Sequence, residues 1–366
     1  MIVPFLRPRL PRPEAWIPIL DESYKKHWFS NFGPVHERFK SALEAKYVQS
    51  GREAVPTANC TVGLAATLCA LDVKGCVAVP SFTFAASAQA ILMAGCEPVY
   101  VDADPSTWHL SLPALRHVIE TQRIAAVMAV RPFGFCFDLS PIAALCREAS
   151  IPLVVDSAAA LGGRTASGLA VGSQGDAEVF SMHATKVFAV GEGGVVMARS
   201  DLGPRIRSAI NFGFAGDTLR ARGFNGKLSE VHCAIGLSML DAIDAEIAGR
   251  SAVARWYGEM LGGSGRQLPC DEVVGRPPWQ TYPVLMPSDS IAERTVADAA
   301  LAGIQLRRYY RPALHRAYSR NSEYPALPVT DRLAQCMVCF PILTDITDSE
   351  KNLLIAFWER IAQAYL

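Results

Sequence analysis

The sequence lacks an excess of either charge, a long apolar run and an apolar leader. Lysine plus arginine and aspartate plus glutamate each number 35, so the formal net charge is zero. This balance gives no reason to expect nucleic acid or an acidic membrane surface as a partner. Without about 18 consecutive uncharged apolar residues, no membrane span is expected. Because proline and arginine interrupt the apolar residues of positions 1–16, we also expect no signal peptide and a cytoplasmic location.

Several ligand-binding patterns are missing as well. There is no GxGxxG after a first strand and no Walker A sequence, which argues against nicotinamide and ATP chemistry. The ten cysteines are scattered through apolar segments, and one pair, Cys336 and Cys339, has the C-x-x-C spacing. Because no second pair and no histidine lies nearby, we interpret both as core residues and expect no metal.

What the sequence does have is a regular alternation of short apolar runs and helical segments. Half of the residues are apolar and 19% are charged, a balance typical of a packed globular protein. The alternation predicts an α/β fold with a mostly parallel central sheet covered by helices. The expected strands are 76–80, 98–101, 125–130, 152–156, 178–181 and 194–198, and the expected helices are 61–71, 85–94, 112–121 and 139–149.

The length of 366 residues exceeds what one hydrophobic core usually organises, so we expect two unequal domains. The regular alternation stops near Leu240. This change predicts a large domain over residues 1–245 and a smaller α+β domain over residues 246–366. In the smaller domain we expect helices at 250–260, 291–302 and 349–365 and strands at 282–286 and 336–342.

Two segments about thirty residues apart carry the chemistry. Asp156 ends the apolar run 151–156, and ligands of open α/β sheets bind at the carboxyl ends of the strands. Lys186 follows the expected strand 178–181 and precedes the glycine-rich turn 191–194. A desolvated lysine can lose its proton near neutral pH and attack a carbonyl. Pyridoxal phosphate (PLP) needs such a lysine, and it needs a carboxylate against its pyridine nitrogen.

The remaining needs of PLP are phosphate donors and an aromatic face. Cys60 and Thr61 begin an expected helix, whose free amides and positive dipole end can hold a phosphate. Ser181 adds a hydroxyl donor, and Phe84 follows the end of a strand. Each residue alone also fits a plainer interpretation: a helix cap, an exposed lysine, a core phenylalanine or an ordinary buried hydroxyl. The argument for PLP is that all of them occur in an order that one site can use.

These segments together resemble the DegT/DnrJ/EryC1/StrS family of sugar aminotransferases, a branch of the fold-type I PLP enzymes. The similarity runs from near residue 4 to the C-terminal helix, and the segment that ends at Lys186 is its most specific part. The matching segments are 31–34, 59–61, 80–84, 95–102, 155–158, 175–176, 180–186, 191–194 and 223–227.

The resemblance implies a role for each matching position. Lys186 matches the lysine that holds PLP as a Schiff base and then shuttles protons between substrate and cofactor. Asp156 matches the partner of the pyridine nitrogen, and Phe84 matches the aromatic residue that stacks on the ring. Three residues fall where the family holds the phosphate: Cys60, Thr61 and Ser181. Asn225 matches an asparagine that reaches the phosphate from the neighbouring subunit, which implies a homodimer with shared active sites.

The sequence departs from the family pattern at some positions. Ala159 stands where the family often has glutamine or histidine near the ring hydroxyl of the cofactor, and Cys60 stands where glycine is common. Family members that dehydrate their substrate replace the lysine with histidine, so Lys186 argues against that chemistry. His183 fits a packed or capping histidine as well as a substrate contact.

A dense cluster of arginine and tyrosine at positions 303–312 is the candidate substrate segment. Arginine forks bind phosphates and tyrosines stack on bases, which suits a nucleotide diphosphate. The alternative is a solvated basic edge. Within the cluster, Arg307, Arg308 and Tyr309 are the residues that we expect to bind substrate.

The function that we favour is amino transfer to a nucleotide sugar. An amino acid, with glutamate as the expected donor, would leave its amino group on the cofactor as pyridoxamine phosphate. This form would then aminate a keto-sugar nucleotide, such as a 4-keto-6-deoxy hexose, to give an amino sugar for a surface polysaccharide such as O-antigen or for a glycosylated metabolite. The alternatives are a PLP-dependent lyase, racemase or amino-acid transaminase on the same fold, or a non-catalytic regulator that binds PLP. The sugar, the nucleotide and the aminated carbon stay open.

Overall fold

The computed structural model describes residues 2–262, 268–318 and 326–365. Seven strands form its central sheet: β1 (Arg52–Thr57), β2 (Cys76–Pro80), β3 (Glu97–Val101), β4 (Ile124–Val130), β5 (Leu153–Asp156), β6 (Ala177–Ser181) and β7 (Gly194–Arg199). Their order across the sheet is β1-β7-β6-β5-β4-β2-β3. The strands from β6 to β3 pair in parallel, whereas β7 runs antiparallel to both β6 and β1. The predicted mostly parallel sheet is therefore confirmed.

Strand β1 is the one strand of this sheet that the sequence did not predict. It carries Arg52, Glu53 and Pro56 and so shows no apolar run. Its position explains the composition, because β1 lies at the edge of the sheet, with β7 as its one neighbouring strand there and an isolated bridge from Thr57 to Lys227 on its other side. Proline and charged side chains are tolerated on edge strands, where one side of the ladder is free.

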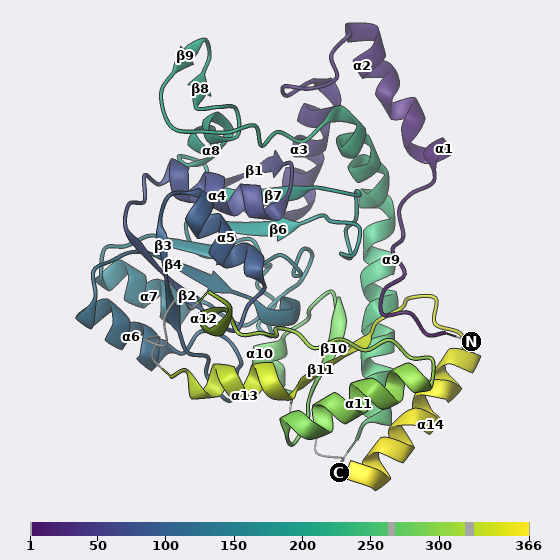
Figure 1. The fold of residues 1–366 in the computed structure, drawn as a ribbon. Coiled ribbons are helices and arrows are strands. Elements are labelled where there is room, and N and C mark those ends of the chain that lie inside the picture. The colour runs from purple at the N-terminus through teal and green to yellow at the C-terminus, as the bar shows by residue number, and fades with distance from the viewer. Residues whose placement is uncertain (1, 263–267, 319–325, 366) are drawn as a thin grey trace.

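Helices cover both faces of the sheet (Figure 1). The helices α4 (Cys60–Ala70), α5 (Ala85–Met93) and α8 (Gly203–Ala209) pack on one face and share a hydrophobic core with it. On the other face lie α3 (Pro34–Tyr47), α6 (Leu112–Thr121), α7 (Ser140–Glu148) and α9 (Glu230–Met260). The strands between the two helix layers are buried on both faces, which explains why their sequences are almost wholly apolar.

Two glycines let the start of helix α4 lie directly against the sheet. A Cβ atom at Gly63 would lie 2.9 Å from the side chain of Val179, and one at Gly194 would lie 2.7 Å from the amide nitrogen of Cys60. The Asn59 side chain caps the helix by accepting a hydrogen bond from the amide of Val62 at 2.9 Å. The amino end of α4 is therefore fixed beside the ends of β6 and β7.

The C-terminal part of the chain builds on helix α9, which is 31 residues long and continues through position 245 without a break. It contains α11 (Asp289–Leu301), α13 (Pro328–Cys336) and α14 (Asp348–Tyr365), with the antiparallel strands β10 (Thr281–Leu285) and β11 (Met337–Pro341). The N-terminal residues also lie here, since Phe5 donates its amide to Gln305 at 3.0 Å and Arg7 pairs with Glu350 at 2.6 Å. The remaining elements are α1 (Pro13–Trp16), η1 (Ile17–Leu20), α2 (Asp21–Lys26), η2 (Pro132–Gly134), β8 (Phe214–Ala215), β9 (Thr218–Leu219), α10 (Asp271–Val274) and α12 (Leu314–Ala317).

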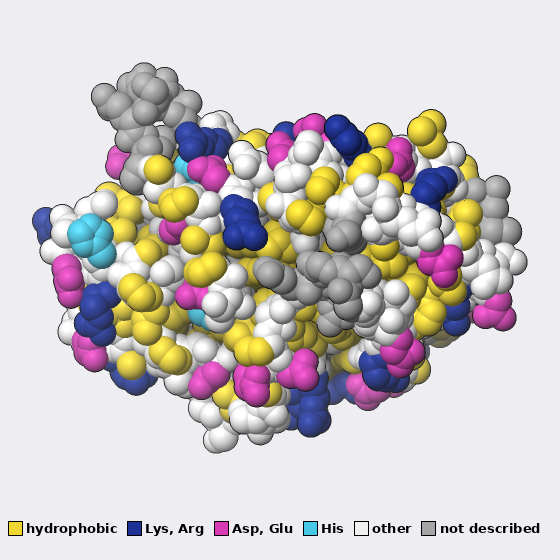
Figure 2. All heavy atoms as spheres, turned by 90° about the horizontal axis from the view of Figure 1, so that it is seen from below, with side chains coloured by type: hydrophobic (Ala, Val, Ile, Leu, Met, Phe, Trp, Pro, Cys, Tyr) yellow, Lys and Arg dark blue, Asp and Glu magenta, His cyan; other side chains and the backbone are white. Residues whose placement is uncertain are grey.

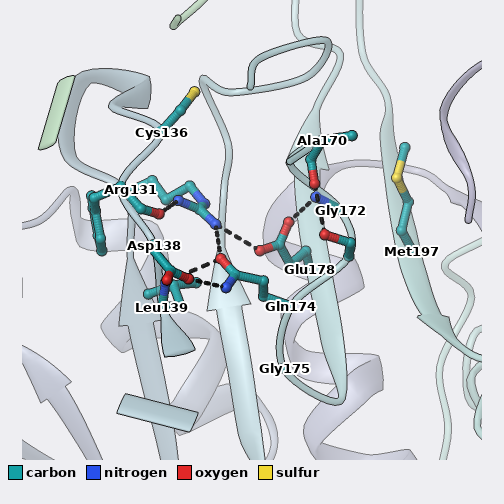
Figure 3. A network of polar contacts seen from close by, with 12 residues as sticks. Arg131, Cys136, Asp138, Leu139, Ala170, Gly172, Gln174, Gly175, Glu178 and Met197 are labelled. Atoms are coloured by element: carbon teal, nitrogen blue, oxygen red, sulfur yellow. Dashed lines mark hydrogen bonds and ion pairs between the residues drawn. The ribbon is translucent and has the colours of Figure 1, made fainter. Parts of the chain in front are cut away.

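A buried polar network joins β6 to the residue that follows β4, the two strands on either side of β5 and its Asp156 (Figure 3). Arg131, directly after β4, pairs with Glu178 of β6 at 3.1 Å, and both side chains are 0% exposed. Arg131 also donates to Gln174 at 3.1 Å, and the amide of Gly172 donates to Glu178. The amide of Arg131 donates to the carbonyl of Asp156 at 3.0 Å, so the network supports the backbone at the end of β5.

The surface fits the balanced composition. On the face that Figure 2 shows, side chains of both charge signs are interspersed with apolar ones. Within the described residues, no helix is long and apolar enough to cross a membrane.

Candidate active site

Asp156 is the last residue of β5 and is 5% exposed. Its carboxylate accepts a hydrogen bond from the Ser87 hydroxyl at 2.6 Å and another from the amide of Ala158 at 3.1 Å. Burial raises the pKa of Asp156, whereas these two hydrogen bonds and the nearby charge of Lys186 lower it. The hydroxyls of Ser87 and Thr83 lie 2.9 Å apart, which ties the loop after β2 to the carboxylate.

Lys186 lies in the turn that joins β6 to β7. The turn is held by hydrogen bonds from the Lys186 amide to the carbonyl of His183 and from the Ala184 amide to the carbonyl of Gly191, both at 2.8 Å. Its side chain is half-buried, and its amine points into the molecule and donates to Oε1 of Gln280 at 2.7 Å. Burial lowers the pKa of Lys186, whereas negative charge on Cys60 and Asp156 raises it. The structure therefore brings the predicted amine and carboxylate into one site.

The predicted phosphate residues lie around the same centre. Cys60 is 7% exposed, and burial raises the pKa of its thiol, to which the charges of Asp156 and Lys186 contribute in opposite directions. Thr61 is half-buried in the first turn of α4, where amides have no acceptor within the helix. Ser181 ends β6 and is 8% exposed, and its hydroxyl accepts a hydrogen bond from the amide of His183 at 3.3 Å.

Phe84 occupies the N-cap position of α5 and is 60% exposed. The plainer interpretation of Phe84 as a core residue is therefore excluded. Its backbone is anchored because the amide of Ser87 donates to the carbonyl of Phe84 at 3.2 Å. The same serine donates a hydrogen bond to Asp156, so the segment that carries the aromatic ring is tied to the buried acid.

Asn225 lies in the segment that precedes helix α9. This segment runs beside the start of α4. The amide of Ala58 donates to the carbonyl of Gly226 at 2.7 Å, and Asn225 forms an isolated bridge with Asn211. A Cβ atom at Gly226 would lie 2.5 Å from the side chain of Val62. These contacts place the backbone of Gly226 next to the amino end of α4 of its own chain, whereas Asn225 itself is exposed.

The predicted substrate segment makes contacts of its own. The guanidinium of Arg307 lies 5.2 Å from the ring centre of Phe5, and the ring of Tyr309 lies edge-on to the same phenylalanine at 5.9 Å. Arg308 is paired with Asp289 at 2.6 Å, and its side chain is 12% exposed. His183, whose side chain is 44% exposed, lies 2.9 Å from the Thr185 hydroxyl and 3.5 Å from Glu192. In the part of the chain that the structure describes, the side chains of Arg307, Arg308 and Tyr309 contact residues other than Lys186 and Asp156.

Three residues that the sequence did not single out lie at the centre of this site. Ser87 and Gln280 bind the carboxylate and the amine, respectively. Tyr310 stacks on Phe133 at 5.2 Å, and burial raises its pKa with a smaller contribution from the charge of Asp156. Tyr310 was within the predicted arginine and tyrosine cluster. The positions of Ser87 and Gln280 gave no signal, because their partners are 69 and 94 residues away in the sequence.

A model of the DegT/DnrJ/EryC1/StrS aminotransferase family matches residues 14–356. The chain belongs to this family. The resemblance inferred from the sequence motifs is thereby confirmed, and with it the assignment to aminotransferases.

Relatives of the chain within this family match it over nearly its whole length. Protein Rv3402c of Mycobacterium tuberculosis (strain ATCC 25618 / H37Rv) is 33% identical over 360 residues, which cover 93% of this chain and 84% of that protein. The dTDP-4-amino-4,6-dideoxy-D-glucose transaminase of Shigella dysenteriae is 30% identical, and the match covers 93% of this chain and 94% of that enzyme. The crystal structure of DesI in the presence of its TDP-sugar product superposes with a TM-score of 0.91 at 31% identity, covering 99% of this chain and 93% of DesI. The predicted fold class is confirmed by this likeness.

The residues of this DegT/DnrJ/EryC1/StrS family member fit PLP. Lys186 provides an amine with a lowered pKa, and Asp156 provides a buried acid that already has two hydrogen-bond donors. The amino end of α4 provides amides and a positive dipole end for a phosphate. The loop after β4 packs closely against Ala159, because a Cβ atom at Gly134 would clash with the carbonyl of Ala159.

Proposed function

We propose that this chain is a PLP-dependent sugar-nucleotide aminotransferase. The observation that carries the proposal is that the amine of Lys186 and the carboxylate of Asp156 lie close enough to shift each other's pKa, with Cys60 at the amino end of α4 within range of both. When bound, PLP supplies an aldehyde that condenses with amines and a ring that accepts electrons. The names of two relatives supply the substrate class: one is a transaminase of a dTDP sugar, and DesI was crystallised with a TDP-sugar product.

In this proposal Lys186 holds the cofactor and moves a proton as a general base and acid. Its lowered pKa increases the fraction of neutral amine near pH 7, which attack on the cofactor aldehyde and proton abstraction both need. The amine that has taken up the proton can then return it as the acid. Asp156 faces the pyridine nitrogen and keeps its proton in place, and the hydrogen bonds from Ser87 and Ala158 keep the carboxylate oriented. Phe84 covers the ring.

The phosphate is held in this proposal by the amides of Cys60 and Thr61, the hydroxyl of Ser181 and Asn225 of a partner subunit. A homodimer with shared sites is supported by large apolar side chains that are exposed near the end of α2 and around β8 and β9, at the top of Figure 1. These exposed residues are Trp28, Phe29, Phe212, Phe214 and Leu219, with exposures between 40% and 64%.

The proposed substrates are an amino-acid donor, with glutamate first, and a keto-sugar nucleotide acceptor that becomes an amino sugar for surface polysaccharide or a glycosylated metabolite in the cytoplasm. The second half of the reaction starts from pyridoxamine phosphate. Arg307, Arg308, Tyr309 and His183 are the proposed substrate-binding residues. Among the three cluster residues, Arg307 and Tyr309 are the better candidates for binding substrate, because the guanidinium of Arg308 is already paired with Asp289.

The test has two arms. PLP added to the full chain should attach to Lys186, seen as a new absorbance band and, after borohydride reduction, as a modified peptide, and Lys186→Ala should abolish both. Glutamate with a dTDP-, UDP- or GDP-linked 4-keto-6-deoxy hexose should then give 2-oxoglutarate and an amino sugar. A chain that never attaches PLP contradicts the cofactor proposal. Turnover of amino acids alone, with no use of any sugar nucleotide, contradicts the substrate proposal.

A further inference from the structure

The amine of Lys186 has a hydrogen-bond partner from the C-terminal part of the chain. Its Nζ donates to Oε1 of Gln280 at 2.7 Å, although the two residues are 94 positions apart. Lys186 belongs to the turn after β6, whereas Gln280 directly precedes β10 in the C-terminal part. The two parts of the chain therefore meet at the reacting nitrogen.

The backbone around Gln280 is fixed from several sides. The ring of Trp279 stacks on Tyr282 at 5.5 Å and meets Phe135 edge-on at 6.1 Å. The Arg250 guanidinium donates to the carbonyl of Trp279 at 3.3 Å. Thr281 is buried and begins the pairing of β10 with β11. With its neighbours held in this way, the amide of Gln280 reaches the amine as a preorganised group.

A neutral acceptor at this position has a specific chemical consequence. An amine that must accept and release protons needs a hydrogen-bond partner when it is not bonded to the cofactor, since a buried donor without one is costly. A carboxylate would satisfy the amine but would also raise its pKa. The ionisable groups whose charge acts on the Lys186 amine are Cys60 and Asp156, and both raise its pKa against the lowering by burial. An amide orients the amine and adds no further negative charge.

We propose that Gln280 is a positioning residue for Lys186: its side-chain amide holds the free amine in place through each half of the reaction and puts no negative charge beside it. The inference rests on the proposed function, because it gives Gln280 a role only where Lys186 reacts with PLP. Nothing in the motifs around Lys186 or Asp156 points to position 280.

The test measures covalent attachment of PLP rather than turnover. The full chain, freed of cofactor, is mixed with PLP between pH 6 and pH 10, and the attachment rate is followed by absorbance and by borohydride reduction with mass spectrometry of the Lys186 peptide. Three variants are compared with the unchanged chain. Gln280→Glu keeps the acceptor and adds a charge, Gln280→Met keeps the size and removes the acceptor, and Gln122→Glu adds the same charge at an exposed site at the end of α6.

The expected results differ in kind. Gln280→Glu should move the midpoint of the pH profile upward by about one unit, and so slow attachment near neutral pH about tenfold. Gln280→Met should slow attachment at every pH without an upward shift of the midpoint, and Gln122→Glu should match the unchanged chain. If both Gln280 variants keep the circular dichroism spectrum and also keep the unchanged rate and midpoint, the inference is wrong. If the unchanged chain attaches no PLP, the proposed function itself fails.

Discussion

Ser87 donates its hydroxyl hydrogen to the buried carboxylate of Asp156 at 2.6 Å. This bond lowers the pKa of Asp156, whereas burial raises it, and the net shift is upward. Because a raised folded-state pKa for an acid means stability that is lost as pH rises, the ionised Asp156 destabilises the cofactor-free chain above its pKa in the unfolded state. If Asp156 has the proposed catalytic role, catalysis and stability make opposite demands on this position.

We expect Asp156→Asn to raise the thermal midpoint of the cofactor-free chain at pH 7 and to remove transamination activity. The variant keeps the size of the side chain and removes the buried charge. Differential scanning calorimetry at pH 7 and pH 4 checks the first part, with a smaller gain at pH 4, where less of the native carboxyl is ionised. A lower midpoint at pH 7 would show that the ionised carboxyl stabilises the fold.

The buried pair of Arg131 and Glu178 should be costly to break on one side. Glu178→Gln leaves the guanidinium without its counter-charge in a fully buried site, so we expect a loss of about 3–5 kcal/mol in the free energy of unfolding. Urea titration measures it. The matched control is Glu148→Gln, because its pair with Arg116 is exposed and should contribute less than about 1 kcal/mol. Equal effects of the two variants would mean that the buried charge is compensated elsewhere.

A second buried contact joins the loop after β2 to the C-terminal part of the chain. His315 is 1% exposed, and its ring lies 2.7 Å from the Ser81 hydroxyl and 3.2 Å from the carboxylate of Asp331. Burial lowers the pKa of His315, while the charges of Asp331 and Asp102 raise it and that of Arg316 lowers it. The unfolded chain therefore binds the proton more readily, and stability should fall as pH drops below about 6.5.

We expect His315→Gln to flatten this pH dependence and to cost about 1–3 kcal/mol at pH 8, where Ser81 loses its buried partner. Thermal midpoints measured from pH 8 to pH 5 compare the variant with the unchanged chain. His117→Gln is the control, because this histidine is exposed on α6. An unchanged slope in the His315 variant would assign the acid sensitivity to other groups.

The proposed shared site predicts complementation between two variants that are each impaired. Lys186→Ala should lose at least about a hundredfold of the activity, since its general acid and base role is removed, and Asn225→Ala should bind PLP more weakly. If Lys186 and Asn225 of one site come from different subunits, mixed dimers contain one site with both native residues, and activity should recover to about a quarter of the unchanged level. Activity assays after joint refolding check this, and a mixture no more active than the average of the two variants refolded separately would place both residues in one subunit.

Most strands of the central sheet were predictable because short apolar runs in the sequence mark them. Strand β2 has the bounds expected from its apolar run, and β4, β5 and β6 differ from expectation by one residue at their start. Strand β1 was missed because an edge strand with Pro56 has no periodic apolar signal. The long helix α9 was expected only over residues 250–260, about the last third of its length, although it begins directly after the cap at Ser229.

The sequence by itself determined which chemical groups the candidate site brings together and which end of the sheet they occupy. An acid at the end of one apolar run and a lysine after the next must share an edge when the strands are parallel, because all parallel strands end on the same side. The tertiary structure alone decided their partners: Ser87 for Asp156, Gln280 for Lys186, Glu178 for Arg131 and Ser81 for His315. Local periodicity specifies which face of an element is buried, whereas the choice of partner depends on how distant elements pack, and no short stretch of sequence encodes that.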